Sequence, residues 1–369
     1  MEKIINTQND DKMWQKITLK YSKPSLRKSI WQIINSVVPY ALTWYLLYKS
    51  LEYPYWVTIL VSVLAAGFLI RIFIIFHDCG HKAFFKSQKT NNLVGKIMGI
   101  LAFTPFYKWH KQHWIHHATS ANLDKRGIGD VWTMTLEEYL KASKWDKFAY
   151  RAFRNPFVMF IIGPVFIVFL TNRLTKKRML KEEKLNIYFT NVMILLMCTA
   201  ISLVIGLKAF LLIQVPVILI AHSIGVWLFY IQHQYDEVMW VRNPEWEYKN
   251  AALFGSSFLK LPPVLQWFTG NIGFHHVHHL SPKIPNYNLS KCHYENEIFS
   301  DIQPIKLLST FRALSLNLWD EANMRMVGFR QIPNALKEKG FEKIGKYSQG
   351  DGRLFIPTAN ATRKTREMI

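Results

Sequence analysis

Residues 56–76 read WVTILVSVLAAGFLIRIFIIF and run directly into HDCGH at residues 77–81. A helix needs about 20 apolar residues to cross the roughly 30 Å hydrocarbon core of a bilayer. The stretch meets that length with one charged residue, Arg71, whose long side chain is expected to extend toward the headgroups. The sequence therefore predicts a membrane-spanning helix that ends in a pair of histidines near the membrane surface.

Three further apolar runs have spanning length, at residues 30–48, 188–207 and 209–231. Two shorter runs, at 93–107 and 157–170, contain glycine and proline, which favours interfacial or re-entrant helices. The pattern predicts an all-α integral membrane protein with about four transmembrane helices, interfacial or re-entrant helices and a cytosolic helical cap.

Composition suggests one large domain with three parts along the chain. Residues 1–29 are predicted to form a cytosolic N-terminal segment. Residues 30–294 form the transmembrane domain that contains the clustered histidines, and 295–369 form a cytosolic C-terminal segment of the same domain with a frayed end. The first apolar run is long and lacks a small-residue cleavage site, so it is interpreted as a retained anchor.

Basic residues in the loops predict the orientation. One loop carries six of them: Arg173, Lys176, Lys177, Arg178, Lys181 and Lys184. The positive-inside rule places this loop in the cytosol, whereas the short links at 50–55 and around Lys208 have almost no basic charge. Both termini and all the histidine stretches then face the cytosol, which predicts a multi-pass protein of the cell (plasma) membrane.

The net charge of +21 has an explanation within that topology. Lysine and arginine on the cytosolic side are attracted to anionic lipid, so a nucleic-acid partner is not required. The three cysteines, Cys79, Cys198 and Cys292, are an odd number at wide spacings. They argue against a disulfide framework and suit a reducing compartment.

Ten of the thirteen histidines fall in three short stretches. Spacings of three and four residues place side chains on one side of a helix, so the rings of each stretch are expected to converge. Eight of them are in register: His77, His81, His113, His116, His117, His275, His278 and His279.

So many imidazoles favour a metal centre with two ions, because acid–base catalysis uses one or two histidines. Imidazole binds iron, copper, zinc and nickel, so the ligand type does not identify the metal. His110 and His276 are not expected to be ligands, and His293 is predicted to be an ordinary surface residue. A metal transporter is a weaker alternative, because transport needs such groups inside the membrane and only His222 falls there.

The box at 77–81 and the HxxHH boxes at 113–117 and 275–279 resemble those of the membrane fatty acid desaturases. Longer strings strengthen the resemblance, including RIFIIFHDCGHKAFF at 71–85 and LQWFTGNIGFHHVHHLSPKIPNYNL at 265–289. Within the family they are most similar to the acyl-lipid desaturases of Bacillus-type bacteria, which include a Δ5 enzyme.

The resemblance implies two iron ions (Fe2+/Fe3+) as the cofactor, with the eight box histidines as ligands. It further implies a fatty acid desaturase that introduces a cis double bond into a saturated acyl chain of membrane phospholipid, with O2 and two external electrons. Δ5 is the position that the resemblance suggests, although no motif specifies it. Membrane di-iron hydroxylases share the boxes and remain the alternative.

An external electron donor is expected, because the sequence shows no haem-binding, dinucleotide-binding or iron–sulfur motif. The resemblance suggests ferredoxin or flavodoxin. Both are usually acidic, and four basic residues are expected to attract them: Lys108, Lys111, Lys125 and Arg126.

A ninth ligand is expected, because the family commonly adds one histidine after the final span. His222 and His233 lie eleven residues apart on one predicted helix, about 16 Å along its axis, so both cannot join one centre. His233, at the cytosolic end, is the predicted ligand and His222 a neutral packing residue. Four acids are candidates to orient the imidazoles from behind: Asp78, Asp124, Asp130 and Asp236.

Overall fold

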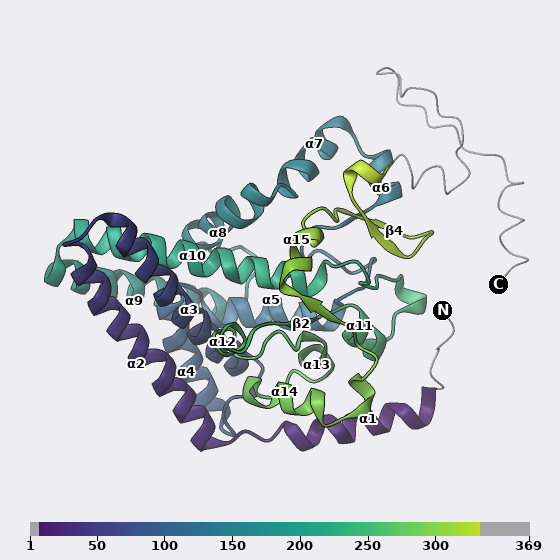
Figure 1. The fold of residues 1–369 in the computed structure, drawn as a ribbon, viewed down its shortest axis with the longest axis horizontal. Helices are drawn as coiled ribbons and strands as arrows, with labels where there is room; N and C mark the ends of the chain where they lie inside the picture. The colour runs from purple at the N-terminus through teal and green to yellow at the C-terminus, as the bar shows by residue number, and fades with distance from the viewer. Residues whose placement is uncertain (1–6, 333–369) are drawn as a thin grey trace, which may run out of the picture.

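The computed structural model describes residues 7–332, which are mostly helical. Four long helices form its framework: α2 (Leu26–Ser50), α3 (Tyr55–Gly80), α9 (Lys181–Ile205) and α10 (Leu207–His233). They pack together on the left of Figure 1, and shorter elements gather on the right. The predicted all-α membrane architecture is confirmed in its main features.

Helices α3, α9 and α10 are each long and apolar enough to cross a membrane. A fourth candidate is the pair formed by α7 (Lys144–Phe153) and residues 158–171, although the two parts are bent by 65°. Three of the four predicted spans are therefore among the candidates. The predicted span at 30–48 lies in α2, which has the length of a span but is not among them.

Helix α2 is less apolar because of polar residues on the face that packs against the bundle. Gln32, Ser36 and Thr43 are buried, whereas Trp31 and Leu42 are exposed. An apolar outer surface with polar groups between helices is the arrangement found in membrane bundles. The polar residues of α2 thus reduce its average hydropathy without placing polar groups on its outer face.

The short apolar run at 157–170, predicted to be an interfacial or re-entrant helix, is irregular in the structure. It consists of two π-helical turns, η1 (Val158–Ile162) and η2 (Ile167–Thr171), on either side of α8 (Gly163–Phe166). π-Helical turns are rare and are frequent at functional sites. The run at 93–107 is divided between α4 (Gln88–Leu101) and the beginning of α5 (Phe106–Thr119).

The expectation that Arg71 extends toward the headgroups is wrong. Its side chain is buried, with Nε and Nη2 both 3.3 Å from Asn35 Oδ1. Its guanidinium lies 3.8 Å from the ring centroid of Trp267 and donates to the carbonyl of that residue. An inward arginine needs such partners, because burial of an unpaired polar group is costly.

The predicted helical cap also contains short strands. Strand β4 (Leu318–Asp320) pairs in parallel with β1 (Met134–Thr135) and antiparallel with β5 (Arg325–Val327). Strand β2 (Phe258–Lys260) pairs in parallel with β3 (Pro304–Lys306). The pairings with β1 and β2 join the chain after residue 300 to earlier segments.

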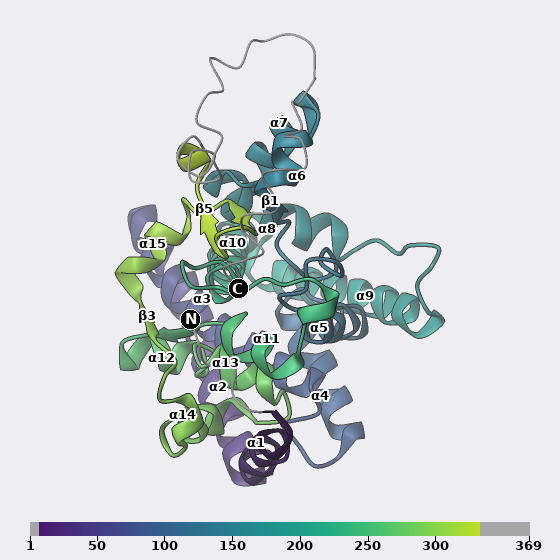
Figure 2. The same ribbon diagram turned by 90° about the vertical axis from the view of Figure 1, so that its right-hand side faces the viewer.

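Short helices lie beyond this framework, and one of them, at residues 275–280, carries the third histidine box next to α11 and α14 (Figure 2). They are α1 (Thr7–Tyr21), α6 (Leu136–Lys141), α11 (Tyr248–Phe254), α12 (Pro263–Phe268), α13 (His275–Leu280), α14 (Asn286–Tyr294) and α15 (Thr310–Ala313). The described residues also contain four 3-10 turns, three between these helices and the last after β5: η3 (Asn243–Glu245), η4 (Glu297–Phe299), η5 (Leu307–Ser309) and η6 (Phe329–Gln331).

Strand β2 holds the beginning of α13 in place. The amide of Leu259 donates to the carbonyl of Gly273, 2.8 Å away, two residues before the box begins. A β-carbon at Gly273 would lie only 2.3 Å from the carbonyl oxygen of Leu259, so this close approach requires glycine. Ser257, just before β2, donates to the carbonyl of Gln232 in α10 at 3.0 Å and accepts from the amide of His276 at 3.2 Å, which links the third box to α10.

Candidate metal centre

The structure brings all nine predicted ligand histidines together in two groups. Within each group, one nitrogen of every ring lies within 4.8 Å of the corresponding nitrogens of the others. The five-histidine group contains His77, His81, His113, His117 and His278, and the four-histidine group contains His116, His233, His275 and His279.

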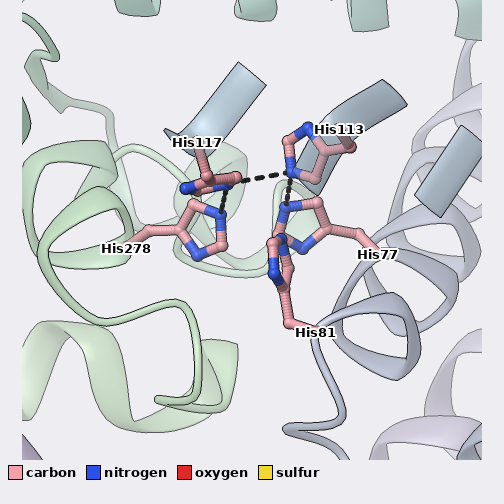
Figure 3. Close-up of side chains that lie close together, drawn as sticks. All are labelled: His77, His81, His113, His117 and His278. Carbon is pink, nitrogen blue, oxygen red and sulfur yellow. Dashed lines mark hydrogen bonds between the residues drawn. The ribbon is translucent and has the colours of Figure 1, made fainter. Parts of the chain in front are cut away.

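Three helices supply the five-histidine group (Figure 3). His113 Nε2 lies 3.0 Å from His77 Nε2 and 3.1 Å from His117 Nε2. His278 Nε2 approaches His117 Nε2 at 3.0 Å. His81 Nε2 is buried and has no hydrogen-bond partner among the described residues, so it is available to a ligand.

The four-histidine group is held by the end of α10 together with α5 and α13. His233 Nε2 lies 3.0 Å from both His116 Nε2 and His275 Nε2. His279 Nε2 lies 3.1 Å from His275 Nε2. Each group therefore has several ring nitrogens directed at one small volume.

Each HxxHH box contributes to both groups, which corrects the expectation that its three rings point the same way. On α5, His113 and His117 belong to one group and His116 to the other. The i and i+4 residues of a helix differ by about 40° in direction, whereas adjacent residues differ by about 100°. On α13, His275 and His279 belong to the four-histidine group and His278 to the five-histidine group. Both α5 and α13 therefore contribute side chains to both groups.

The donor set fits a metal cation. His116 Nδ1 lies 2.5 Å from Asp130 Oδ1, and His233 Nδ1 lies 3.0 Å from the carbonyl oxygen of Gly255. Both oxygens accept hydrogen bonds, so each Nδ1 carries the ring proton. The two Nε2 atoms then present lone pairs to each other at 3.0 Å, an arrangement that a cation between them stabilises.

Burial opposes protonation of these rings. It lowers the pKa of His117, His275, His278 and His279 well below the usual value for histidine, and neighbouring imidazoles lower it further. Neutral imidazole is the form that binds metal ions, so the environment preserves the binding form.

Two of the four candidate acids contact ring nitrogens. Besides Asp130, these contacts involve Asp78, whose Oδ1 lies 3.1 Å from His77 Nδ1. Its Oδ2 accepts from the amide and side chain of Asn286 at 2.7 and 2.8 Å. Asp124 is paired with Arg242 instead.

The fourth acid, Asp236, is paired with Arg312 at 3.3 Å. Asp124 and Asp236 therefore pair with arginines from other segments, and no contact with a ring nitrogen is shown for either of them in the described residues.

The remaining histidines lie outside both groups. His222 Nδ1 lies 3.0 Å from the carbonyl of Ile218 in its own helix, and His110 stacks on Phe106. His276 Nε2 lies 3.0 Å from His293 Nδ1. The prediction that His293 is a surface residue is wrong.

Residue 293 is buried because three phenylalanines surround its ring: Phe258, Phe274 and Phe299. They come from segments on both sides of the third box, so local sequence does not indicate their approach.

An apolar cavity of about 760 Å³ leads to the histidines. It lies between α3, α5, α10 and the π-helical segment, and His77, His113 and His275 form part of its wall. Its volume is within the range of roughly 300–1,000 Å³ that small-molecule sites have.

The residues lining this cavity were not identified from the sequence. A signal was present: Phe73 and Phe229 line it, and each precedes a proposed ligand, His77 and His233, by one helical turn. Residues one and two turns before a candidate ligand lie on the same side of its helix. The segments of α3 and α10 that precede His77 and His233 therefore both form part of the cavity wall.

The four basic residues that are expected to attract an acidic electron donor do not form an open basic surface. Lys108 is buried, and its Nζ donates to the carbonyl of Thr171. Lys111 is paired with Glu183 at 3.1 Å, and Arg126 is paired with Glu138. Of the four, Lys125 is the one that is exposed without an ion pair shown in the described structure.

The family model "Fatty acid desaturase" matches residues 54–302, the part of the chain that contains both histidine groups. The chain is 47% identical to a "Fatty acid desaturase" of Bacillus subtilis (strain 168) over 312 residues, which cover 85% of this chain and 89% of that protein.

More distant relatives have more specific names. One is an "sn-1 oleoyl-lipid 12-desaturase" of Synechocystis, 26% identical over 67% of this chain and 70% of that protein. Another is an "sn-1 acyl-lipid omega-3 desaturase (ferredoxin)" of Nostoc, 24% identical over 73% of this chain and 75% of that protein. Together with the extent of the family match, these similarities show that the chain belongs to the fatty acid desaturase family.

Proposed function

We propose that this chain is a di-iron acyl-lipid desaturase that introduces a cis double bond into a saturated acyl chain of membrane phospholipid. The observation that carries the proposal is the position of the two histidine groups at the wall of an apolar cavity. Ring nitrogens that need a cation and a space suited to a hydrocarbon chain occur at the same place.

The proposed ligands of the two irons are the nine grouped histidines: His77, His81, His113, His117 and His278 for one, and His116, His233, His275 and His279 for the other. When bound and reduced, iron supplies the O2 activation that abstraction of hydrogen from an unactivated methylene requires, chemistry that side chains alone do not perform.

The protein residues bind, orient and shield. Asp78 and Asp130 hold the Nδ1 protons of His77 and His116, and this keeps each Nε2 free for metal. Phe73 and Phe229 belong to the apolar wall that would hold the acyl chain and exclude water from the reacting carbons.

The names of two relatives support the finer assignments. One acts on an oleoyl-lipid and the other on an acyl-lipid with ferredoxin. An acyl chain esterified in a lipid is therefore the proposed substrate, and ferredoxin or flavodoxin the proposed donor. Δ5 is the proposed position of the double bond, and product analysis tests it.

The proposed location is the plasma membrane, with the histidine boxes and both termini in the cytosol. The candidate spans α3 and α10 support a membrane location with the histidine groups at the ends of the spans, because each of these helices ends at one of the groups. Within the proposed division into residues 1–29, 30–294 and 295–369, strand β3 joins the last part to the second. The predicted frayed end lies outside the described residues.

Expression in a bacterium that lacks desaturases, followed by gas chromatography–mass spectrometry of its lipids, tests the reaction. New monounsaturated chains would support desaturation and would reveal the bond position. Hydroxylated chains without new double bonds would assign the chain to the hydroxylases instead.

Metal analysis of purified active protein tests the cofactor. About two irons per chain are expected from the two groups, each with at least four imidazoles. Stoichiometric zinc with negligible iron in active protein would overturn this assignment. Conversion of acyl-CoA but not of preformed phospholipid would reject the proposed substrate.

A further inference from the structure

A second cavity, of about 160 Å³, lies between α5 and the chain that leads into α9. Figure 2 shows α5 and α9 next to each other, and the loop that leads into α9 extends to the right. Four cationic side chains line the cavity, here called the basic pocket: Lys108, Lys111, Lys176 and Arg178.

The charges of the basic pocket are not balanced. Glu183 is its one acidic residue within the described part of the chain. That carboxylate accepts from Lys111 Nζ at 3.1 Å and from the amide of Leu180 at 2.7 Å. Four cations against one carboxylate leave a formal surplus of three positive charges, which favours an anionic ligand.

In the described part of the chain, Lys108 shows a carbonyl partner but no carboxylate of the kind that usually pairs with a buried cation. Its side chain is 5% exposed, and its Nζ contacts the carbonyl of Thr171. Burial, together with the cations Lys176 and Arg173, lowers the pKa of Lys108 to about 8. Buried charges are normally paired, so an anion in the pocket would supply the missing compensation.

The basic pocket adjoins the apolar cavity. Gln112 lines both of them. Thr171, whose carbonyl accepts from Lys108, also lines the apolar cavity. Gln112 is followed on α5 by His113, a member of the five-histidine group. A molecule with an anionic end and a long apolar tail would therefore find both environments side by side.

We propose that the basic pocket binds the phosphodiester of the phospholipid whose acyl chain occupies the apolar cavity. This inference rests on the acyl-lipid substrate proposed above. Lysine and arginine are the usual phosphate-binding side chains, through charge-assisted hydrogen bonds. A hollow of about 160 Å³ has room for a headgroup phosphate, whereas a protein donor needs a broad surface.

Anchoring at this point has a consequence for the reaction. The phosphate and the ester are joined by a short glycerol unit, so a fixed phosphate places the carboxyl end of the chain at a fixed position. The carbon that reaches the histidine groups is then counted from the carboxyl end. The basic pocket would thus help to determine the position of the double bond.

A binding measurement tests the pocket without turnover. Purified full-length protein is titrated with dioctanoyl phosphatidylglycerol, and with dioctanoylglycerol, which lacks the phosphate. The double variant Lys176→Gln/Arg178→Gln should bind the phospholipid about tenfold more weakly, because two charged contacts are lost. Its affinity for dioctanoylglycerol should be unchanged.

The matched control is Lys177→Gln/Lys181→Gln, which removes two exposed charges from the same segment but does not alter the lining of the pocket. It should bind both lipids as the natural sequence does. Equal phospholipid binding by the two double variants would overturn the proposal.

Two further measurements test whether the pocket binds free phosphate or the electron donor instead of a lipid. Inorganic phosphate should displace the lipid only far above the lipid's own Kd, and displacement at comparable concentrations would assign the pocket to free phosphate. A raised KM for reduced ferredoxin with unchanged lipid affinity in the pocket variant would assign it to the electron donor.

Turnover separates this proposal from the function on which it rests. Lipid that binds in the pocket but is never desaturated would contradict the proposed function and leave the pocket supported. Desaturation of phospholipid with the same KM in both double variants would contradict the pocket alone.

Discussion

The imidazoles of His116 and His233 face each other with their Nε2 atoms 3.0 Å apart, although 117 residues of sequence separate them. On the opposite side of each ring an oxygen atom, from Asp130 or from the backbone of Gly255, holds the Nδ1 proton. The two rings are thus oriented from behind and directed at a common point, which is where we place one of the two irons.

Replacement of His233 by alanine should abolish desaturation and reduce bound iron, because its Nε2 lies within 3.0 Å of two other members of its group. The measurements are iron content by mass spectrometry and product formation in cells.

The control is His222→Ala on the same helix. His222 bonds to the backbone of its own helix and lies outside both groups, so its variant should retain nearly all the iron. The opposite order of iron loss would move the ninth ligand into the membrane and contradict the proposed site.

Asp130→Asn should lower iron affinity or activity about 10–100-fold, because partners behind a ligand histidine set its tautomer and orientation. An amide can donate to Nδ1 as well as accept, so the ring is no longer held with its proton on that nitrogen. Iron titration of the purified variant checks this.

Asp124→Asn is the matched control, since Asp124 contacts Arg242 and not a histidine. Activity and iron content should stay at the level of the natural sequence. Equal losses in the two variants would indicate that Asp130 acts through general folding and not through His116.

Gly225→Leu should reduce conversion of the longest acyl chains and leave iron content unchanged. Gly225 lines the apolar cavity, and a β-carbon there would meet no atom within 4 Å, so a larger side chain occupies free space. It lies eight residues before His233, about 12 Å along the helix, so it would act on the chain away from the reacting carbons.

Lipid profiling of cells fed with fatty acids of different lengths measures the effect. Val215→Phe provides a comparison, because Val215 is on the outer side of the same helix and 39% exposed. A uniform loss of activity for all chain lengths with Gly225→Leu would argue against a role in length selection.

Phospholipid affinity should fall as pH rises through about 8. The pKa of Lys108 is lowered to about 8, so its positive charge is present below that pH and is lost above it. A phosphodiester keeps its single negative charge over the same range, so the attraction weakens. Charged groups that also face this ammonium or share its pocket are Lys111, Arg173, Lys176, Arg178 and Glu183.

Binding of dioctanoyl phosphatidylglycerol between pH 7 and pH 9 measures this decline. The variant Lys108→Gln should bind more weakly at pH 7 and show a smaller change with pH, whereas Lys177→Gln should retain the full change. An unchanged pH profile in Lys108→Gln would show that another group is responsible.

Local sequence was sufficient for the helices and for the identity of the candidate ligands. The length of an apolar run depends only on residues within one helix. The sequence alone therefore predicts the candidate spans α3, α9 and α10. Where polar residues such as Gln32 are buried between helices, as in α2, composition alone is a weaker guide.

The distribution of the histidines between two groups was not visible in the spacing. His113 and His117 share a side of their helix, but only the packing of α5 against α3 and α13 places them with His77 and His278. The inward turn of Arg71, the burial of His293 and the pairing of Asp124 with Arg242 likewise involve partners from other segments.

The difference has one physical reason. The 3.6-residue period and the length of an apolar run depend on neighbours a few positions away. Each histidine box is short enough to be recognised from such neighbours alone. Burial, pairing and cavity shape depend on which side chains meet across separate helices. The candidate ligands can thus be read from the chain. Their division into two groups, and the contact between the basic pocket and the apolar cavity at Gln112, arise only when the helices pack.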